Sequence, residues 1–129
     1  MSLALIDLDW LKRINDTFGH PTGDEVLRTF AITIFSNIRV LDRFGRYAVE
    51  EFLMLLPNTS RQEACSLLDR LRVIVADLDW SAFSPGMRVT LSAGVTTMSF
   101  GEHAETILAR ADTALYTAKA EGRDRIAIA

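Results

Sequence analysis

LIDLDWLKRINDTFGHPTGDEVL, residues 5–27, is the stretch that decides the fold of this chain. Residues 3–9 form a short apolar run that ends in two acids, which is typical of a buried strand. Residues 10–18 then show the spacing of an amphipathic helix, and its expected core side carries Trp10, Leu11, Ile14 and Phe18. Glycines and a proline in residues 19–23 predict a break, and residues 24–38 predict a second helix. A strand that leads directly into two helices indicates a fold in which helices pack on a sheet.

The rest of the chain adds strands and helices to this start. Residues 43–47 and 51–56 predict a β-hairpin with a very short turn. Further strands are expected at residues 88–97 and 125–129, and further helices at residues 60–77 and 102–120. The resulting order, βααββαβαβ, indicates an α+β sandwich in which helices cover a mainly antiparallel sheet. No repeat or linker divides the chain, so we expect a single domain over residues 1–129.

The composition limits the classes of function. The chain has 129 residues, 49% of them hydrophobic, which is enough for one buried core. A net charge of -3 argues against a general nucleic-acid-binding protein. No apolar run approaches the roughly 18–20 residues that span a bilayer, and Cys65 is the only cysteine, so a reducing, cytoplasmic location is expected. The first strand begins almost at once, so we expect a domain truncated at its N-terminus and without membrane contact of its own.

Two acidic groups are candidates for binding a metal ion. Asp7 and Asp9 lie two residues apart at the end of the first strand, so we expect their carboxylates to project to the same side. Paired carboxylates favour a cation between them, and oxygen ligands suit Mg²⁺. Glu50 and Glu51 lie at the turn of the hairpin, and Glu50 would complete the site if the hairpin lay beside the first strand. The alternatives are a helix-capping acid at the strand end and a solvated turn.

Asn15 and Asp24 flank the glycine-rich break between the first two helices. A carboxylate can accept hydrogen bonds from both the N1–H and the N2 amino group of guanine, and an amide supplies a complementary donor and acceptor. These two residues are therefore candidates for reading a guanine base. The alternatives are a polar helix position for Asn15 and a helix N-cap for Asp24.

Basic residues form two further candidate groups. Lys119 and Arg123 flank Gly122 at the end of the last helix, where they would either complement the helix dipole or bind nucleotide phosphates. A second group would form either a surface ion pair or a site for phosphates and guanine edges. Its members are Arg39, Asp42 and, from the third helix, Arg70. The residue types alone leave these alternatives open.

Taken together, four segments resemble the GGDEF family, bacterial domains that join two GTP molecules into cyclic di-GMP. They are residues 5–27, RYAVEEF (46–52), LSAGV (91–95) and ARADTALYTAKAEGRDRI (109–126), and the likeness covers nearly the whole chain. The resemblance implies a nucleotide-cyclase or palm-like fold, that is, a ferredoxin-like α+β sandwich. It also implies GTP as substrate, cyclic di-GMP as product, Mg²⁺ or Mn²⁺ as cofactor and a homodimer for catalysis.

The resemblance assigns roles residue by residue. Asp7, the Leu8 carbonyl and Glu50 match the metal ligands of the family. Glu51 and a metal-bound hydroxide are both candidates to take the proton of the attacking hydroxyl group.

The other matched positions bind nucleotide. The pair that reads guanine corresponds to Asn15 and Asp24. The positions at the phosphates correspond to Lys12, Lys119 and Arg123. The inhibitory RxxD site for cyclic di-GMP corresponds to Arg39 and Asp42, with Arg70 as its additional arginine.

One position group departs from the family pattern, because Ala48 and Val49 replace two glycines of the signature. The favoured two-residue hairpin turns need positive φ angles, which glycine adopts freely and a β-branched residue does not. We therefore expect a turn of another type or length, which would move Glu50 and slow turnover.

Three functions are consistent with the sequence. The first is a slow, product-inhibited diguanylate cyclase, which transfers a nucleotidyl group between two GTP molecules. The second is a receptor module that binds cyclic di-GMP or GTP without turnover. The third is a dimerisation module, which the ligand-type residues argue against.

Overall fold

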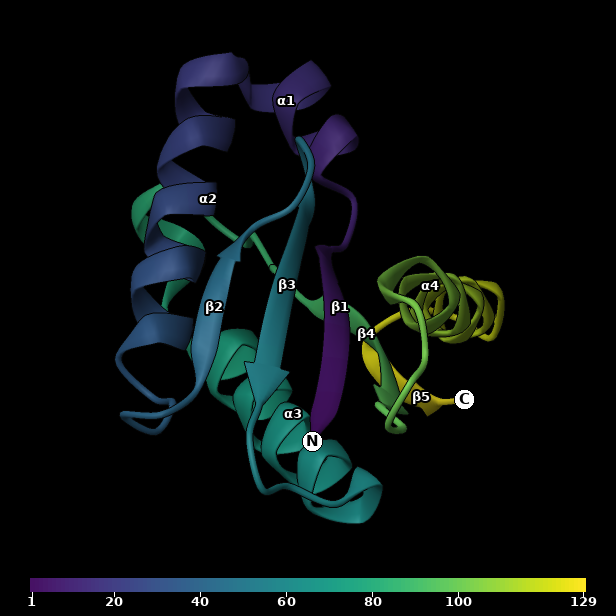
Figure 1. Ribbon diagram of the computed structural model, residues 1–129. Coiled ribbons are helices and arrows are strands. Elements are labelled where there is room, and N and C mark those ends of the chain that lie inside the picture. Colours follow the sequence, from purple (N-terminus) through teal and green to yellow (C-terminus); the bar gives the residue numbers. More distant parts are fainter.

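Strand β1 (Ser2–Leu8) lies at the centre of a five-stranded sheet in the computed structural model, which describes residues 1–129. It pairs antiparallel with β3 (Glu51–Leu56) on one side and with β4 (Leu91–Thr97) on the other. The sheet order is β2-β3-β1-β4-β5, with β2 (Arg43–Arg46) and β5 (Arg125–Ile128) at its edges. Only the β4–β5 pair is parallel, so the expected mainly antiparallel sheet is confirmed (Figure 1).

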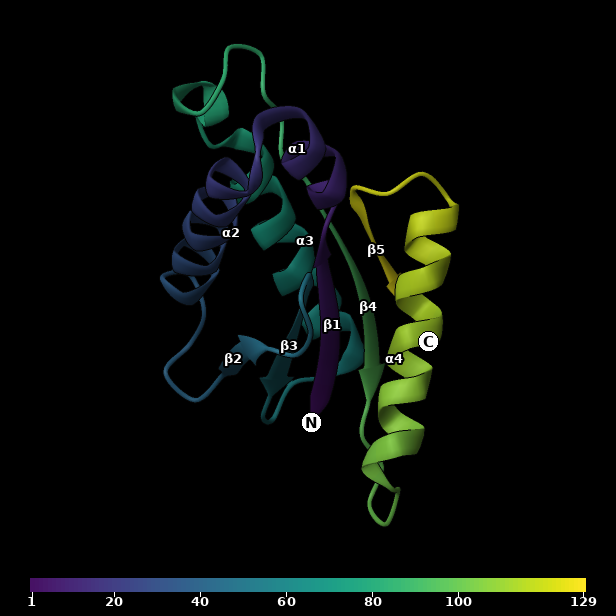
Figure 2. The same ribbon diagram turned by 90° about the horizontal axis from the view of Figure 1, so that it is seen from above.

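Helices cover both faces of this sheet, as Figure 2 shows. Helices α1 (Leu11–Phe18), α2 (His20–Phe35) and α3 (Arg61–Asp77) lie on one side, and α4 (Ala104–Ala120) lies on the other. A short 3₁₀-helix, η1 (Trp80–Ala82), follows α3 and was not expected from the sequence. The predicted α+β sandwich is therefore correct.

The two faces of β1 build two cores. Ala4, Ile6 and Leu8 belong to the larger one, which they share with apolar side chains of α1, α2 and α3. Leu3 and Leu5 belong to a smaller core beneath α4. Because alternate residues of a strand point to opposite faces, β1 is buried on both sides and is the most deeply placed element.

Helix α4 lies directly on the backbone of β4. A Cβ atom at Gly94 would come within 2.3 Å of the Ala111 carbonyl oxygen and of the Leu115 nitrogen, so only glycine allows this approach. The close contact fixes where the last turn of α4 lies, and that turn carries Lys119.

Several predicted boundaries are wrong by a few residues. Helix α2 begins at His20 rather than residue 24, because Gly19 (φ 92°) makes the turn and Pro21 fits the first turn of a helix. It ends at Phe35 rather than residue 38, and β4 begins at Leu91 rather than residue 88. The expected start of α3 is confirmed by a capping box between Ser60 and Glu63.

Two aromatic residues expected in the core lie at the surface. Trp10 is 47% exposed and Phe18 is 41% exposed, whereas Leu11 and Ile14 are buried as expected. Helix α1 begins only at Leu11, and Trp10 precedes it in the left-handed region with φ 62°. This backbone conformation directs the ring of Trp10 away from the apolar side of the helix. None of the helices combines the length and the apolarity needed to cross a membrane.

Candidate active site at the end of strand β1

The carboxyl end of β1 carries a buried carboxylate. Asp7 is paired with Glu51 across the β1–β3 ladder and is only 5% exposed. Its Oδ2 accepts a hydrogen bond from Nζ of Lys119 in the last turn of α4. Its Oδ1 is buried without any hydrogen-bond partner. An oxygen of this kind is costly to bury and marks a place where a cation or donor is needed.

The environment of Asp7 also changes its acidity. Burial is the main cause that raises the pKa of this carboxyl from 3.8 to about 6, and the charges of Glu50 and Glu51 raise it further. The ammonium group of Lys119 opposes these effects through its hydrogen bond and its charge. Three carboxyl groups therefore interact at one end of the sheet, with a single lysine paired to one of them.

A cleft of about 250 Å³ opens at this point. Asp7, Leu8 and Glu50 line it, so the first strand and the hairpin do meet there as the sequence analysis required. Carboxylate and carbonyl oxygens are the donors that Mg²⁺ prefers, and the unpartnered Oδ1 of Asp7 gives such an ion a ligand. The donor set therefore fits a divalent cation with hard oxygen ligands.

Asp9 lines the same cleft, but its carboxylate has partners within the chain. Its carboxylate accepts hydrogen bonds from Oγ1 of Thr90 (2.7 Å), Oγ of Ser92 (2.6 Å) and the backbone N–H of Asp124 (3.0 Å). Asp7 and Asp9 both line this cleft, but the carboxylate of Asp9 is already satisfied within the chain, which leaves Asp7 as the stronger candidate for binding a cation. Asp9 also caps no helix; it ties the last loop to β4.

Asn15 and Asp24 lie on either side of the close contact between α1 and α2. A Cβ atom at Gly23 would come within 1.6 Å of Oδ1 of Asn15, so Gly23 makes room for this side chain. The Oδ1 atom is buried and has no hydrogen-bond partner. Asp24 lies inside α2 and is not its N-cap, since Gly19 occupies that position. The capping alternative for Asp24 is therefore wrong.

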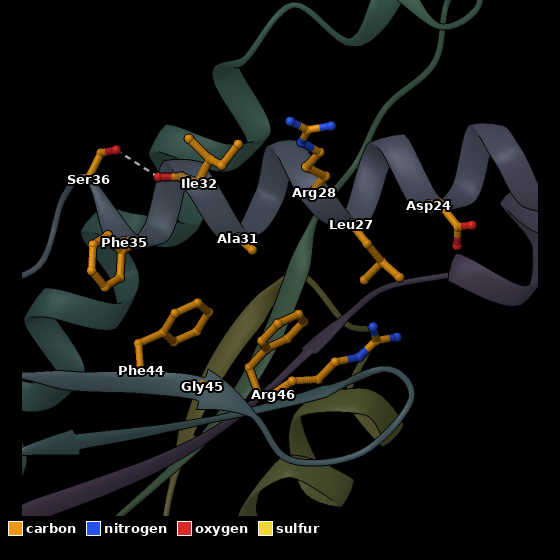
Figure 3. A pocket seen from close by; sticks show the side chains of 11 residues that line it. Asp24, Leu27, Arg28, Ala31, Ile32, Phe35, Ser36, Phe44, Gly45 and Arg46 are labelled. Carbon is orange, nitrogen blue, oxygen red and sulfur yellow. Dashed lines mark hydrogen bonds between the residues drawn. The ribbon is translucent and has the colours of Figure 1, made fainter.

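Asp24 lines one end of a groove of about 730 Å³ that lies between α2 and strand β2 (Figure 3). Leu27 and Ala31 face β2 from the helix, and Phe44 faces the helix from the strand. The groove is mainly apolar, which suits the face of a base better than a phosphate. Sequence reasoning missed it, because its walls come from two elements that only the fold brings together.

The hairpin between β2 and β3 has the altered form expected from Ala48 and Val49. Four residues, 47–50, connect the strands, and none of them has a positive φ angle. The guanidinium group of Arg46 donates hydrogen bonds to the carbonyl groups of Ala48 and Val49, which holds the loop closed. Val49 is exposed at its tip. The turn therefore needs no positive φ angle, as expected for Ala48 and Val49, and no strained backbone accompanies it.

Basic side chains line the same cleft. The cationic residues that line it are Lys12, Arg13, Lys119 and Arg123. Gly122 (φ 125°) ends α4 as expected, and Arg123 follows it with φ 64°. Two of the arginines lie over the ring of Trp10, with Arg123 3.9 Å and Arg13 4.3 Å from its centroid. Arg13 and Trp10 were not identified from the sequence, since a lone arginine and an aromatic residue on a helix carry no specific signal.

Arg39 and Asp42 form a separate cluster beyond the far end of the sheet, with a pocket of about 220 Å³ beside them. Asp42 is buried and accepts hydrogen bonds from Nη2 (2.8 Å), Nε and the backbone N–H of Arg39. Burial, the largest influence, favours the neutral acid, but the bonds and charge of Arg39 outweigh it and lower the pKa of Asp42. Arg70 donates to the Asn37 carbonyl oxygen (3.1 Å), which places it beside the same loop.

Comparison with known proteins places these features in context. The sequence profile described as "Diguanylate cyclase, GGDEF domain" matches residues 1–125. The response regulator PleD of Caulobacter vibrioides is 42% identical over 129 residues, which cover 98% of this chain and 28% of PleD.

Two solved structures are also similar. Diguanylate cyclase SiaD of Pseudomonas aeruginosa, solved with its activator SiaC, has a TM-score of 0.93 at 42% identity, over 99% of this chain and 49% of that one. The GGDEF domain of DgcB from Caulobacter crescentus, solved with c-di-GMP, has a TM-score of 0.91 at 34% identity, over 98% of this chain and 76% of that one. The present chain thus spans less than a third of PleD and about half of the SiaD chain.

Proposed function

Because this chain belongs to the GGDEF family of diguanylate cyclase domains, we propose that it condenses two molecules of GTP into cyclic di-GMP and releases pyrophosphate. The observation that carries the proposal is the buried Oδ1 of Asp7, which has no hydrogen-bond partner. It lies in a cleft that Glu50 and several basic side chains also line. A structural ion pair with Lys119 alone would leave that oxygen unexplained.

The guanine base is expected at Asp24, with Asn15 as its second partner. Asp24 lies at the end of the apolar groove, where its carboxylate would accept hydrogen bonds from the N1–H and the N2 amino group of guanine. Adenine does not offer this pair of donors, so the contact would select guanine. Lys12, Lys119 and Arg123 then hold the phosphates in the adjoining cleft. Lys119 already contacts Asp7, so it exchanges one negative partner for another when nucleotide binds.

Bond formation requires two domains, because each provides one nucleotide site. The 3′-hydroxyl oxygen of one GTP forms a bond to the α-phosphorus of the other, the bond to pyrophosphate breaks, and the same step closes the ring. Asp7, the Leu8 carbonyl and Glu50 would hold Mg²⁺ or Mn²⁺, which neutralises the phosphates and the developing negative charge. Glu51 lies opposite Asp7 in the ladder, and it and a metal-bound hydroxide are the candidates to accept the hydroxyl proton.

Product inhibition is assigned to the cluster of Arg39 and Asp42, with Arg70 as a further contact. Nη1 of Arg39 is used in no hydrogen bond of the chain, so one edge of the guanidinium group remains available to a guanine or phosphate. The carboxylate of Asp42 holds the guanidinium group in place by accepting hydrogen bonds from its Nε and Nη2. Substitution of Arg39 by alanine should weaken binding of cyclic di-GMP measured by calorimetry, without a dependence on Mg²⁺.

The central test is incubation of the chain with GTP and Mg²⁺, followed by chromatography for cyclic di-GMP and pyrophosphate. Glu50→Gln should lower product formation, because a metal ligand loses its charge, and Asp112→Asn on the exposed side of α4 serves as the matched control. The proposal fails if neither this chain nor a longer form of the protein makes product while Mg²⁺ and GTP bind normally.

A second candidate is a receptor that binds cyclic di-GMP or GTP without turnover. The four-residue hairpin with an exposed Val49 favours it, since a bulky side chain at this position restricts how closely a nucleotide approaches the backbone. The same incubation separates the two functions, because the receptor would bind both nucleotides and release no pyrophosphate.

A further inference from the structure

Trp10 occupies an unusual position at the entrance to the cleft. Its ring is half exposed, and two guanidinium groups lie over it, that of Arg123 at 3.9 Å from the centroid and that of Arg13 at 4.3 Å. An arginine over an indole face is attracted by the ring quadrupole. Two arginines on one ring, however, bring like charges close together, and this arrangement gains most when an anion lies beside both.

Neither arginine has an anionic partner within the chain. Arg39, Arg72 and Arg110 each form an ion pair with a carboxylate. Arg13 and Arg123 take part in no ion pair, and their guanidinium groups make no hydrogen bond. Both line the cleft of Asp7 and Glu50, so their hydrogen-bond donors are free beside the proposed metal site.

The backbone on both sides of the stack is held in a conformation that side chains rarely adopt. Trp10 has φ 62° and Arg123 has φ 64°. Such residues persist only where the surroundings hold them, and they concentrate at functional sites. The loop after α4 is held by the Asp124 N–H, which donates to Asp9 (3.0 Å), and by the ion pair of Asp124 with Arg72 (3.0 Å).

We propose that Trp10 is a positioning residue that holds Arg13 and Arg123 over its ring as an anion site for the terminal phosphates of the bound nucleotide. The inference rests on the proposed function for the identity of the nucleotide. It adds Arg13 to the phosphate-binding residues and gives Trp10 a role that acts through the two arginines. Two guanidinium groups at one site suit a chain of phosphates, which offers oxygens to both, better than a single phosphate.

Trp10 also provides a direct signal for this site. The chain has two tryptophans, and Trp80 is buried, with its indole N–H donating to the Val75 carbonyl oxygen (2.8 Å). The fluorescence of Trp80 should therefore stay constant when a ligand enters the cleft. Titration with inorganic tripolyphosphate should therefore change the emission of the wild-type chain and leave that of Trp10→Phe unchanged.

Affinity for tripolyphosphate and for GTP, measured by calorimetry, tests the positioning role. Trp10→Leu should weaken both by roughly threefold to tenfold, because the stacking that orders the arginines is lost. Trp10→Phe keeps an aromatic face and should restore most of the affinity. Arg61→Gln, which removes a charge at the start of α3 near the opposite end of the sheet, should bind as the wild type does.

Two comparisons separate positioning from a general structural effect. Trp10→Leu should weaken binding of GTP but not of GMP, since GMP lacks the terminal phosphates. In the background of Arg123→Ala and Arg13→Ala, Trp10→Leu should cause no further loss, because the residues through which it acts are gone. Three results would each overturn the inference. They are an unchanged affinity for GTP in Trp10→Leu, an equal loss of affinity for GMP, and a loss from Trp10→Leu that is the same with and without the two arginine substitutions.

Failure of the proposed function gives a different result. A wild-type chain that binds tripolyphosphate through Trp10 but shows no preference of GTP over ATP would refute guanine recognition and leave the anion site standing. A wild-type chain whose fluorescence and calorimetry show no binding of tripolyphosphate would refute the anion site, whatever GTP does.

Discussion

Asp7 and Asp42 are both buried carboxylates beside a basic residue, yet the chain treats them in opposite ways. Asp42 receives two side-chain groups and a backbone N–H from Arg39, and its pKa is lowered. Asp7 receives only Lys119, keeps one oxygen without a partner, and has a pKa raised to about 6. Both carboxylate oxygens of Asp42 thus have hydrogen-bond partners, whereas one oxygen of Asp7 has none. Asp7 is therefore where a ligand is expected.

The difference follows from the elements that supply the partners. Arg39 and Asp42 are three residues apart on one loop, so a local turn brings the guanidinium fork onto the carboxylate. Asp7 and Lys119 come from opposite ends of the chain and meet only because α4 packs on β4. Glu50 and Glu51 then add like charge from the hairpin. A long-range site can therefore remain unsatisfied while a local pair is already complete.

Loss of charge at the two positions should give the largest contrast. Asp7→Asn removes a ligand charge that a divalent cation needs, so GTP turnover should fall by at least about 1000-fold. Asp42→Asn should instead weaken inhibition by cyclic di-GMP. Chromatography of the product at several concentrations of added cyclic di-GMP measures both effects. Asp112→Asn is the control for both, and equal loss of turnover in all three variants would contradict the comparison.

The pH dependence of stability should have opposite signs for the two acids. The folded chain holds the Asp7 proton until about pH 6, while the unfolded chain releases it near 3.8, so this group stabilises the fold at low pH and the contribution disappears as pH rises through 6. The rise corresponds to about 3 kcal/mol. Asp42, with a lowered pKa, contributes stability above 3.8 that is lost as pH falls through its folded value.

Urea unfolding of the metal-free chain at several pH values measures this linkage. Relative to the wild type, Asp7→Asn should gain stability as pH rises from about 4 to 7. Asp42→Asn should be less stable than the wild type throughout that range, and its deficit should shrink only as pH falls below 3.8. Parallel pH profiles for the two variants would show that both carboxylates are equally satisfied.

Asp42→Ala should lower the free energy of unfolding by about 2 kcal/mol at neutral pH, because a buried, charge-assisted set of hydrogen bonds is lost. Asp69→Ala is the matched control, since Asp69 forms a similarly spaced ion pair with Arg72 but is exposed. That change should cost about 0.5 kcal/mol. Equal costs in urea unfolding would mean that burial of Asp42 adds nothing.

The hairpin should give the smallest effect. Ala48→Gly combined with Val49→Gly should lower stability by about 1 kcal/mol, because no residue of the turn needs a positive φ and glycine adds freedom to the unfolded chain. Turnover should rise severalfold if Val49 restricts nucleotide approach. Urea unfolding and product chromatography measure the two effects, and unchanged turnover would mean that the turn does not limit the reaction.

Much of the fold was predictable because its signals are local. Apolar periodicity gave the order of the strands and helices, and it placed the start of α3 within one residue of Arg61. The change of turn at Ala48 and Val49 was also predictable, because it follows from the φ preferences of single residues. Periodicity failed at Trp10, where a left-handed backbone turned the side chain away from the core.

The sequence by itself determined the residue types at the candidate site and the order of the elements that carry them. Only the tertiary structure decided which acids are available: Asp9 is bound by Thr90 and Ser92, while Asp7 keeps a free oxygen. It also decided that two arginines share the ring of Trp10. The physical reason is that periodicity and turn chemistry act between near neighbours, whereas burial and hydrogen-bond partners depend on segments up to 115 residues apart.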